Sequence, residues 1–116
     1  MAREIHLVID ANDPDRLARF WSEALGYEIA AGVAQYRSLR DPEGKGPKLL
    51  IQGVGEPKVV KNRLHIDIAA DDLEAEAARL VALGARRLQE APVEEFGISW
   101  ILLADPEGNE LCVVPA

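Results

Sequence analysis

Residues 5–29 read IHLVIDANDPDRLARFWSEALGYEI, and residues 64–88 read LHIDIAADDLEAEAARLVALGARRL. Laid over each other at an offset of 59, the two stretches place His6 on His65, and these are the only two histidines in the chain. Both stretches pass from alternating apolar residues to a helical spacing of apolar residues. The match predicts that one structural unit of roughly 55 residues occurs twice.

The tetrapeptide DPEG extends this repeat. It stands at residues 41–44 and again at 105–108, and around it AQYRSLRDPEG aligns with ISWILLADPEG at an offset of 64, with Tyr36 on Trp100. Pro at the second position and Gly at the fourth are typical of a type I turn. We therefore expect DPEG to join the last two strands of each unit.

Each unit reads as a strand, a helix and three further strands. Asp13-Pro14 and Asp71-Asp72 predict the helix starts, with Glu74 placed for a capping box from Asp71. The helices end at Gly26 and Gly84, and the Gly- and Pro-containing segment 53–62 predicts a linker. The expected strands are 3–9, 27–32, 34–40, 48–52, 64–68, 85–90, 98–104 and 110–114.

Composition narrows the classes of function. The net charge of −7 with a pI near 4.8 argues against nucleic acid binding and is compatible with a neutral or cationic small molecule. No apolar stretch has the roughly 18–20 residues that span a bilayer, and the N-terminal sequence does not resemble a signal peptide. A single cysteine excludes an internal disulfide, so we expect a cytoplasmic protein.

Strand alternation predicts which side chains lie on the sheet face away from the helices. His6, His65 and Asp67 fall on that face, and Glu110 and Cys112 join them because Leu111 and Val113 face the core. Two histidines and a carboxylate with open positions make a workable site for a divalent metal. The alternative is an ordinary solvent-facing polar surface.

Two further residues have both a functional and a structural interpretation. Trp100, like Tyr36, stacks on a flat ligand in one interpretation and packs in the core or an interface in the other. Cys112 is a nucleophile only if a base activates it, and no nearby motif supplies one. The sequence therefore favours a small buried side chain at Cys112.

The duplicated βαβββ unit, the histidine that opens each half, the helix ending in Leu-Gly and the closing DPEGNELCVV together resemble the vicinal oxygen chelate superfamily. This superfamily includes glyoxalase I, extradiol dioxygenases and bleomycin-resistance proteins, and the chain is most similar to its short glyoxalase-like domains of actinobacterial type. The resemblance implies an α+β fold: one domain over 1–116, built from tandem βαβββ modules (about 1–52 and 63–116). Their curled mixed sheets form a cup with the helices outside. It also implies a homodimer.

In the metal-dependent members, positions in the first, fourth, fifth and eighth strands bind the ion. Carried over by resemblance, these positions are His6, Gln52 and His65, with Cys112 where the family's closing motif has a ligand Glu. Glu110 stands on the same face, roughly 6–7 Å along the strand. The implied metal set is His6, Gln52, His65 and Glu110, with Glu110 as the catalytic carboxylate.

We expect a small-molecule-binding protein of sequestering or resistance type. Its ligand would lie in the cup, in contact with a set of side chains drawn from both halves: His6, Gln52, His65, Trp100, Glu110 and Cys112. The alternative is a metal-dependent lyase, isomerase or dioxygenase in which His6, His65 and a carboxylate surround the ion. Two alternatives stay open for the cofactor: none, or a divalent ion (zinc, nickel, iron or manganese).

Overall fold

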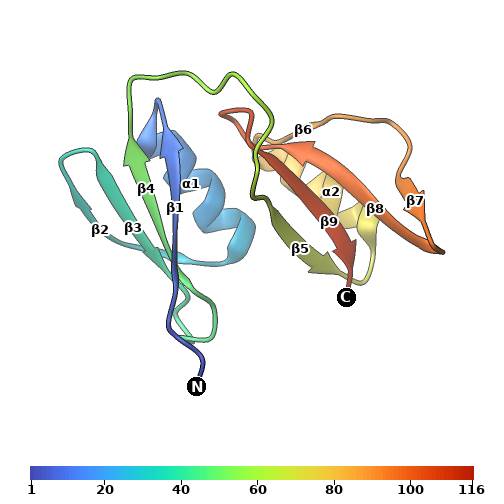
Figure 1. Cartoon of the computed structure of the whole chain (residues 1–116), viewed down its shortest axis with the longest axis horizontal. Helices are drawn as coiled ribbons and strands as arrows, with labels where there is room; N and C mark the ends of the chain where they lie inside the picture. Colours follow the sequence, from blue (N-terminus) through green and yellow to red (C-terminus); the bar gives the residue numbers. More distant parts are fainter. The chain divides into compact units, whose positions relative to one another are not determined.

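The computed structural model describes all residues, 1–116. The chain divides into two compact units, Met1–Pro57 and Lys58–Ala116, which are described separately below. Each unit is a mixed sheet with one helix packed on one face (Figure 1), so the predicted α+β fold with two βαβββ units is confirmed. None of the helices is long and apolar enough to cross a membrane.

The first unit contains β1 (His6–Ala11), α1 (Pro14–Leu25), β2 (Glu28–Val33), β3 (Tyr36–Arg40) and β4 (Lys48–Gly53). The strand order is β1-β4-β3-β2, in which β1 and β4 are parallel and the other pairs are antiparallel. The core packs the buried side chains of α1 against the inner face of β3 and β4; it comprises Leu17, Phe20, Trp21, Leu39, Leu49 and Ile51.

The second unit repeats this topology. It contains β5 (Ile66–Ala70), α2 (Leu73–Leu83), β6 (Arg86–Arg87), β7 (Val93–Glu95), β8 (Ile98–Ala104) and β9 (Glu110–Pro115). The order is β5-β9-β8-β6, again with a parallel first pair, while β7 also pairs with β8. The strand predicted over 85–90 is shorter than expected, because β6 covers only residues 86–87. A separate strand, β7, follows the segment that contains Pro92, which has no N–H to donate to a ladder.

The helix ends follow the predicted capping chemistry with one correction. Asp13 accepts a hydrogen bond from the Arg16 N–H at 3.1 Å, and Asp72 accepts one from the Ala75 N–H at 3.0 Å. The N-cap is therefore Asp72, and the capping box predicted from Asp71 to Glu74 is wrong. The Glu74 carboxylate instead pairs with Arg87, at 2.6 Å.

Both DPEG segments form the predicted turn. The Gly44 N–H donates to the Asp41 carbonyl at 2.9 Å, and the Gly108 N–H donates to the Asp105 carbonyl at the same distance. Each glycine has a positive φ (71° and 89°), which a residue without Cβ adopts at little cost. The repeated tetrapeptide therefore positions the last strand of both units in the same way.

The predicted strong curl of the sheets is not observed. Each main sheet path has only four strands, so a twist of about 20–25° between neighbours accumulates over three pairs. Each sheet has one face covered by its helix and one face that its own helix leaves open. We call the latter the helix-free face of each unit.

Candidate functional site

The helix-free face of the second unit carries a row of three residues from neighbouring strands. Asp67 of β5 lies opposite Cys112 of β9, and Cys112 lies opposite Leu102 of β8. Leu111 and Val113, on either side of Cys112, are fully buried against the other face, where α2 packs. Strand alternation therefore fixes Asp67 and Cys112 on the helix-free face.

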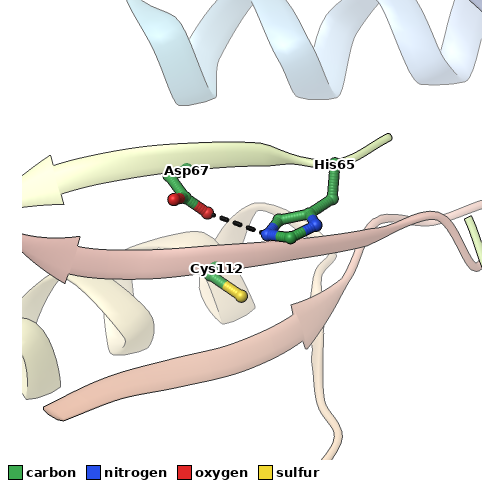
Figure 2. A group of neighbouring side chains, drawn as sticks. All are labelled: His65, Asp67 and Cys112. Atoms are coloured by element: carbon green, nitrogen blue, oxygen red, sulfur yellow. Dashed lines mark ion pairs between the residues drawn. The ribbon is translucent and has the colours of Figure 1, made fainter. Parts of the chain in front are cut away.

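His65 completes a cluster with these two residues. Its Nε2 atom lies 3.1 Å from the Asp67 carboxylate, and the potential ligand atoms of His65, Asp67 and Cys112 all lie within 4.8 Å of one another. Figure 2 shows the Asp67 carboxylate directed at the imidazole of His65, with the Cys112 thiol near them on the neighbouring strand. An imidazole nitrogen, a carboxylate oxygen and a sulfur thus converge on one side of the sheet.

The surroundings of Cys112 argue against a nucleophile. Burial raises the pKa of the Cys112 thiol above its ordinary value, and the Asp67 carboxylate raises the pKa further. The thiol is also only 5% exposed. Because the thiolate is the reactive form, this cysteine is a weak nucleophile at neutral pH.

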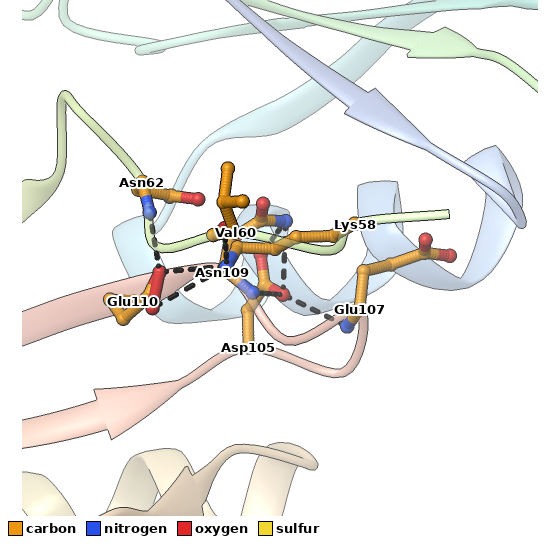
Figure 3. Close-up of polar contacts among 7 residues, drawn as sticks. All are labelled: Lys58, Val60, Asn62, Asp105, Glu107, Asn109 and Glu110. Atoms are coloured by element: carbon orange, nitrogen blue, oxygen red, sulfur yellow. Dashed lines mark hydrogen bonds and ion pairs between the residues drawn. The ribbon is translucent and has the colours of Figure 1, made fainter. Parts of the chain in front are cut away.

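Glu110, the predicted catalytic carboxylate, is held by the segment that precedes β5. Its Oε1 atom accepts a hydrogen bond from the Asn62 N–H at 3.0 Å and lies 3.1 Å from Lys58 Nζ (Figure 3). Burial acts to raise the pKa of Glu110, but the Asn62 N–H and the Lys58 ammonium outweigh it and hold the pKa below its ordinary value. A carboxylate in this state is a poor proton acceptor.

In the first unit, the predicted site residues His6 and Gln52 lie apart. His6 is opposite Lys48, with its Nε2 atom 3.4 Å from Glu4, whereas Gln52 is opposite Asp10. The two positions are four residues apart along both strands, or about 13 Å at the usual strand rise.

The strand register also relates the two units residue by residue. His6 corresponds to His65, so Val8, which lies opposite Leu50, corresponds to Asp67, which lies opposite Cys112. The first unit has two extra residues between its turn and its last strand, and these shift the alignment from an offset of 64 to one of 62. The register therefore places Leu50 at the position equivalent to Cys112.

Trp100 lies on the helix-free face of the second unit, two residues along β8 from Leu102 and opposite Val93. Its side chain is partly exposed, whereas Trp21 is 1% exposed in the core of the first unit. The helix-free face thus carries Trp100 on the same side of the sheet as the cluster, two residues along β8 from Leu102, the register partner of Cys112.

The donor set of this cluster fits a divalent cation. Zinc binds sulfur, nitrogen and oxygen ligands at about 2.0–2.3 Å in tetrahedral geometry, so its ligand atoms stand roughly 3.3–3.8 Å apart. Three atoms within 4.8 Å reach that spacing with small side-chain rotations. When bound, such an ion supplies Lewis acidity toward an oxygen of a ligand.

Asp67 is absent from the set predicted for the site. The sequence could have indicated Asp67, because it is two residues from His65 and alternation therefore puts both side chains on the same face. What the sequence could not give is the register of β5 with β9, which sets Asp67 directly beside Cys112.

Two βαβββ units, with the strand orders β1-β4-β3-β2 and β5-β9-β8-β6 and one helix on each sheet, match the vicinal oxygen chelate fold. The chain belongs to the glyoxalase-like domain family, whose model matches residues 6–114. No curated protein matches its sequence.

Several solved structures share the fold at low identity. A glyoxalase/bleomycin resistance protein/dioxygenase family enzyme from Burkholderia phytofirmans has a TM-score of 0.75 and 16% identity, over 96% of this chain and 97% of that one. The fosfomycin resistance protein FosX from Mesorhizobium loti has a TM-score of 0.74 and 15% identity, over 100% and 93%. A bleomycin-binding protein complexed with bleomycin has a TM-score of 0.66 and 18% identity, over 99% of both chains.

Proposed function

We propose that this chain is a small-molecule-binding protein whose ligand contacts the helix-free face of the second unit. The observation that carries the proposal is the combination on that face of a partly exposed aromatic, Trp100, with the polar cluster of His65, Asp67 and Cys112. Binding sites for small molecules are mostly apolar with a few convergent polar groups. The bleomycin-bound neighbour shares the fold, which supports a sequestering or resistance role.

The charge of the chain favours a class of ligand. With a net charge of −7, the surface attracts a neutral or cationic molecule more readily than an anion. The carboxylate of Asp67, whose side chain is 50% exposed, and the aromatic ring of Trp100 on the same face both favour a ligand with a cationic group. The assignment to short domains of actinobacterial type and a homodimeric, cytoplasmic state remain proposals from the sequence.

Intrinsic fluorescence tests this function directly. A Trp21→Phe variant leaves Trp100 as the only tryptophan, so any ligand that contacts the helix-free face changes its emission. We expect at least one member of a library of aromatic and cationic small molecules to do so and to raise the melting temperature. Trp100→Ala should then weaken its binding about tenfold, which corresponds to about 1.4 kcal/mol.

Phe96 supplies a matched control for the loss of an aromatic ring. It is 99% exposed at the tip of the β7–β8 hairpin, so Phe96→Ala should leave ligand binding unchanged. Equal weakening by Phe96→Ala and Trp100→Ala would contradict a site on the helix-free face. A library in which no member alters the Trp100 emission would contradict the binding function.

A metal-dependent lyase, isomerase or dioxygenase is the second candidate, with His65 among the ligands of its ion. The observation that favours it is the convergence of His65 with Asp67 and Cys112. Glu110 is less suited to supply the carboxylate, because its oxygens are already engaged by Lys58 and Asn62. Conversion of a substrate by metal-loaded protein, lost in His65→Ala, is the result expected of this candidate.

A further inference from the structure

We propose that His65, Asp67 and Cys112 form a divalent-cation site of zinc type that is complete within the second unit. This site differs from the set that the family resemblance implies, in which both units contribute ligands and Glu110 takes part. It includes Asp67, a residue outside that set, and it requires neither His6 nor Gln52. It also does not rest on small-molecule binding, because the cation would bind whether or not a ligand contacts Trp100.

Backbone geometry fixes most of the site. His65 directly precedes β5 and Asp67 lies in it two residues further along, and their side chains already approach to 3.1 Å. Asp67 and Cys112 are register partners in the parallel β5–β9 pair. The β ladder sets Asp67 beside Cys112, and His65 directly precedes the same strand, so small side-chain rotations bring the three donors to a shared ion.

The donor types select the class of cation. A thiolate, an imidazole and a carboxylate together suit zinc, whereas calcium and magnesium prefer sites made of oxygen alone. On binding, the Cys112 sulfur forms a bond to the cation and its proton passes to solvent, so no oxidant or reductant is needed. The cation replaces the proton that otherwise keeps the buried thiol neutral.

The exposure of the three donors would place the ion between the protein interior and solvent. Cys112 is only 5% exposed, whereas the side chains of His65 and Asp67 are 42% and 50% exposed. The sulfur would therefore bind the ion from the protein side, while the other two donors bind it from the solvent side. Three protein ligands leave a fourth position for water or a ligand atom, as in zinc sites that act on bound molecules.

Metal analysis and cobalt spectroscopy test the site on the full-length chain. We expect about one zinc ion per chain after purification without chelator or after reconstitution with zinc. Substitution with Co²⁺ should give a thiolate-to-cobalt charge-transfer band, which reports the sulfur ligand independently of any activity. Cys112→Ser and Cys112→Ala should abolish this band, and Asp67→Asn should weaken zinc at least tenfold in competition with a chromophoric chelator.

The first unit supplies the matched control. His6→Ala removes the histidine equivalent to His65 from the same strand position, so His65→Ala should release zinc and His6→Ala should retain it. Circular dichroism and thermal melting of each metal-free variant show whether it folds, and using two substitutions at Cys112 keeps the result interpretable if one of them unfolds.

Three results would overturn the proposal. One is the absence of bound zinc after reconstitution of folded protein. Another is a loss of zinc in His6→Ala as large as in His65→Ala, which would mean that both units contribute. The third is a charge-transfer band or zinc affinity that survives in folded Cys112→Ser. A ligand that still quenches Trp100 in metal-free protein would leave the binding function intact in each case.

Discussion

The two units share a topology and differ in the chemistry of one row of side chains. Across β1, β4 and β3 the row reads Val8, Leu50 and Ser38, and Val8 is 54% exposed. Across β5, β9 and β8 the same row reads Asp67, Cys112 and Leu102. The repeated core and turns therefore specify the fold in both units, whereas the helix-free faces carry different side chains.

The largest expected effect tests whether the two cores are equivalent. Leu39 and Leu103 occupy matching positions, each fully buried, and each faces a leucine of the neighbouring last strand. Leu39→Ala and Leu103→Ala should each lower the free energy of unfolding by about 2–5 kcal/mol, because each leaves a cavity under a helix. Urea unfolding followed by circular dichroism measures both losses.

Leu50→Ala is the control for this pair. Leu50 lies one residue from the buried Leu49 and Ile51 but on the helix-free face, and it is partly exposed. We expect it to cost clearly less than either core substitution. If Leu39→Ala or Leu103→Ala cost less than about 1 kcal/mol, that core would be loosely packed and the units would not be structural equivalents.

A smaller effect separates the two DPEG turns. Asp105 is 3% exposed and accepts hydrogen bonds from the backbone N–H groups of Glu107 and Asn109 and from the Asn109 side chain. Asp105→Ala leaves these part-buried donors without that acceptor, which costs about 1–3 kcal/mol. Thermal and urea unfolding measure the loss, and Asp105→Asn, which keeps one oxygen, should fall between wild type and Asp105→Ala.

The first turn should respond less to the same change. Asp41 accepts from the N–H groups of Glu43, Lys45 and Gly46, and these bonds hold its pKa below the ordinary value. Water reaches this turn, however, so it solvates the donors when Asp41→Ala removes the carboxylate. A loss for Asp41→Ala equal to that for Asp105→Ala would show that burial does not distinguish the turns.

Much of the fold could be predicted because local signals agreed with the repeat. Asp13-Pro14 and Gly26 bound α1 as expected, and the DPEG turns lie where the repeat placed them. The capping box at Glu74 failed because a tertiary partner, Arg87, competes for the same carboxylate. A rule based on neighbouring residues cannot identify Arg87 as a partner, because it lies 13 residues from Glu74 in the sequence.

The candidate site was predictable in part. Alternation predicted His65, Glu110 and Cys112 for the helix-free face, since period two is a property of the strand itself, and the structure brings His65 and Cys112 together. Register was not predictable, because the two residues added after the first DPEG shift β4 against the repeat. That shift places Leu50, rather than Gln52, at the position equivalent to Cys112.

Glu110 gives a pH-dependent contrast between the units. Because its pKa lies below the ordinary value, its charge stabilises the folded chain above the unfolded-state pKa of about 4.3. This stability is lost as the pH falls through the folded-state pKa. Glu110→Gln should therefore cost about 1–2 kcal/mol at pH 7 and progressively less as the pH falls below the unfolded-state pKa, measured by urea unfolding.

Lys48 is the counterpart of Glu110, as the first residue of the last strand in its own unit. It is exposed, so Lys48→Gln should change stability little at either pH. A cost for Glu110→Gln that stays constant between pH 7 and pH 3 would show that the Lys58 and Asn62 contacts do not depend on the charge.

The smallest effect concerns the hairpin tips. Ala34 in the β2–β3 turn and Phe96 in the β7–β8 turn both have positive φ, 51° and 52°, which favours Asn or Gly. Ala34→Asn and Phe96→Asn should each stabilise the chain by about 0.5–1 kcal/mol, because neither original side chain is buried. The melting temperature should rise in both variants. If only Phe96→Asn raised the melting temperature, the backbone strain at positive φ would depend on the bulky ring of Phe96. The two hairpin turns would then differ in stability, just as the two helix-free faces differ in chemistry.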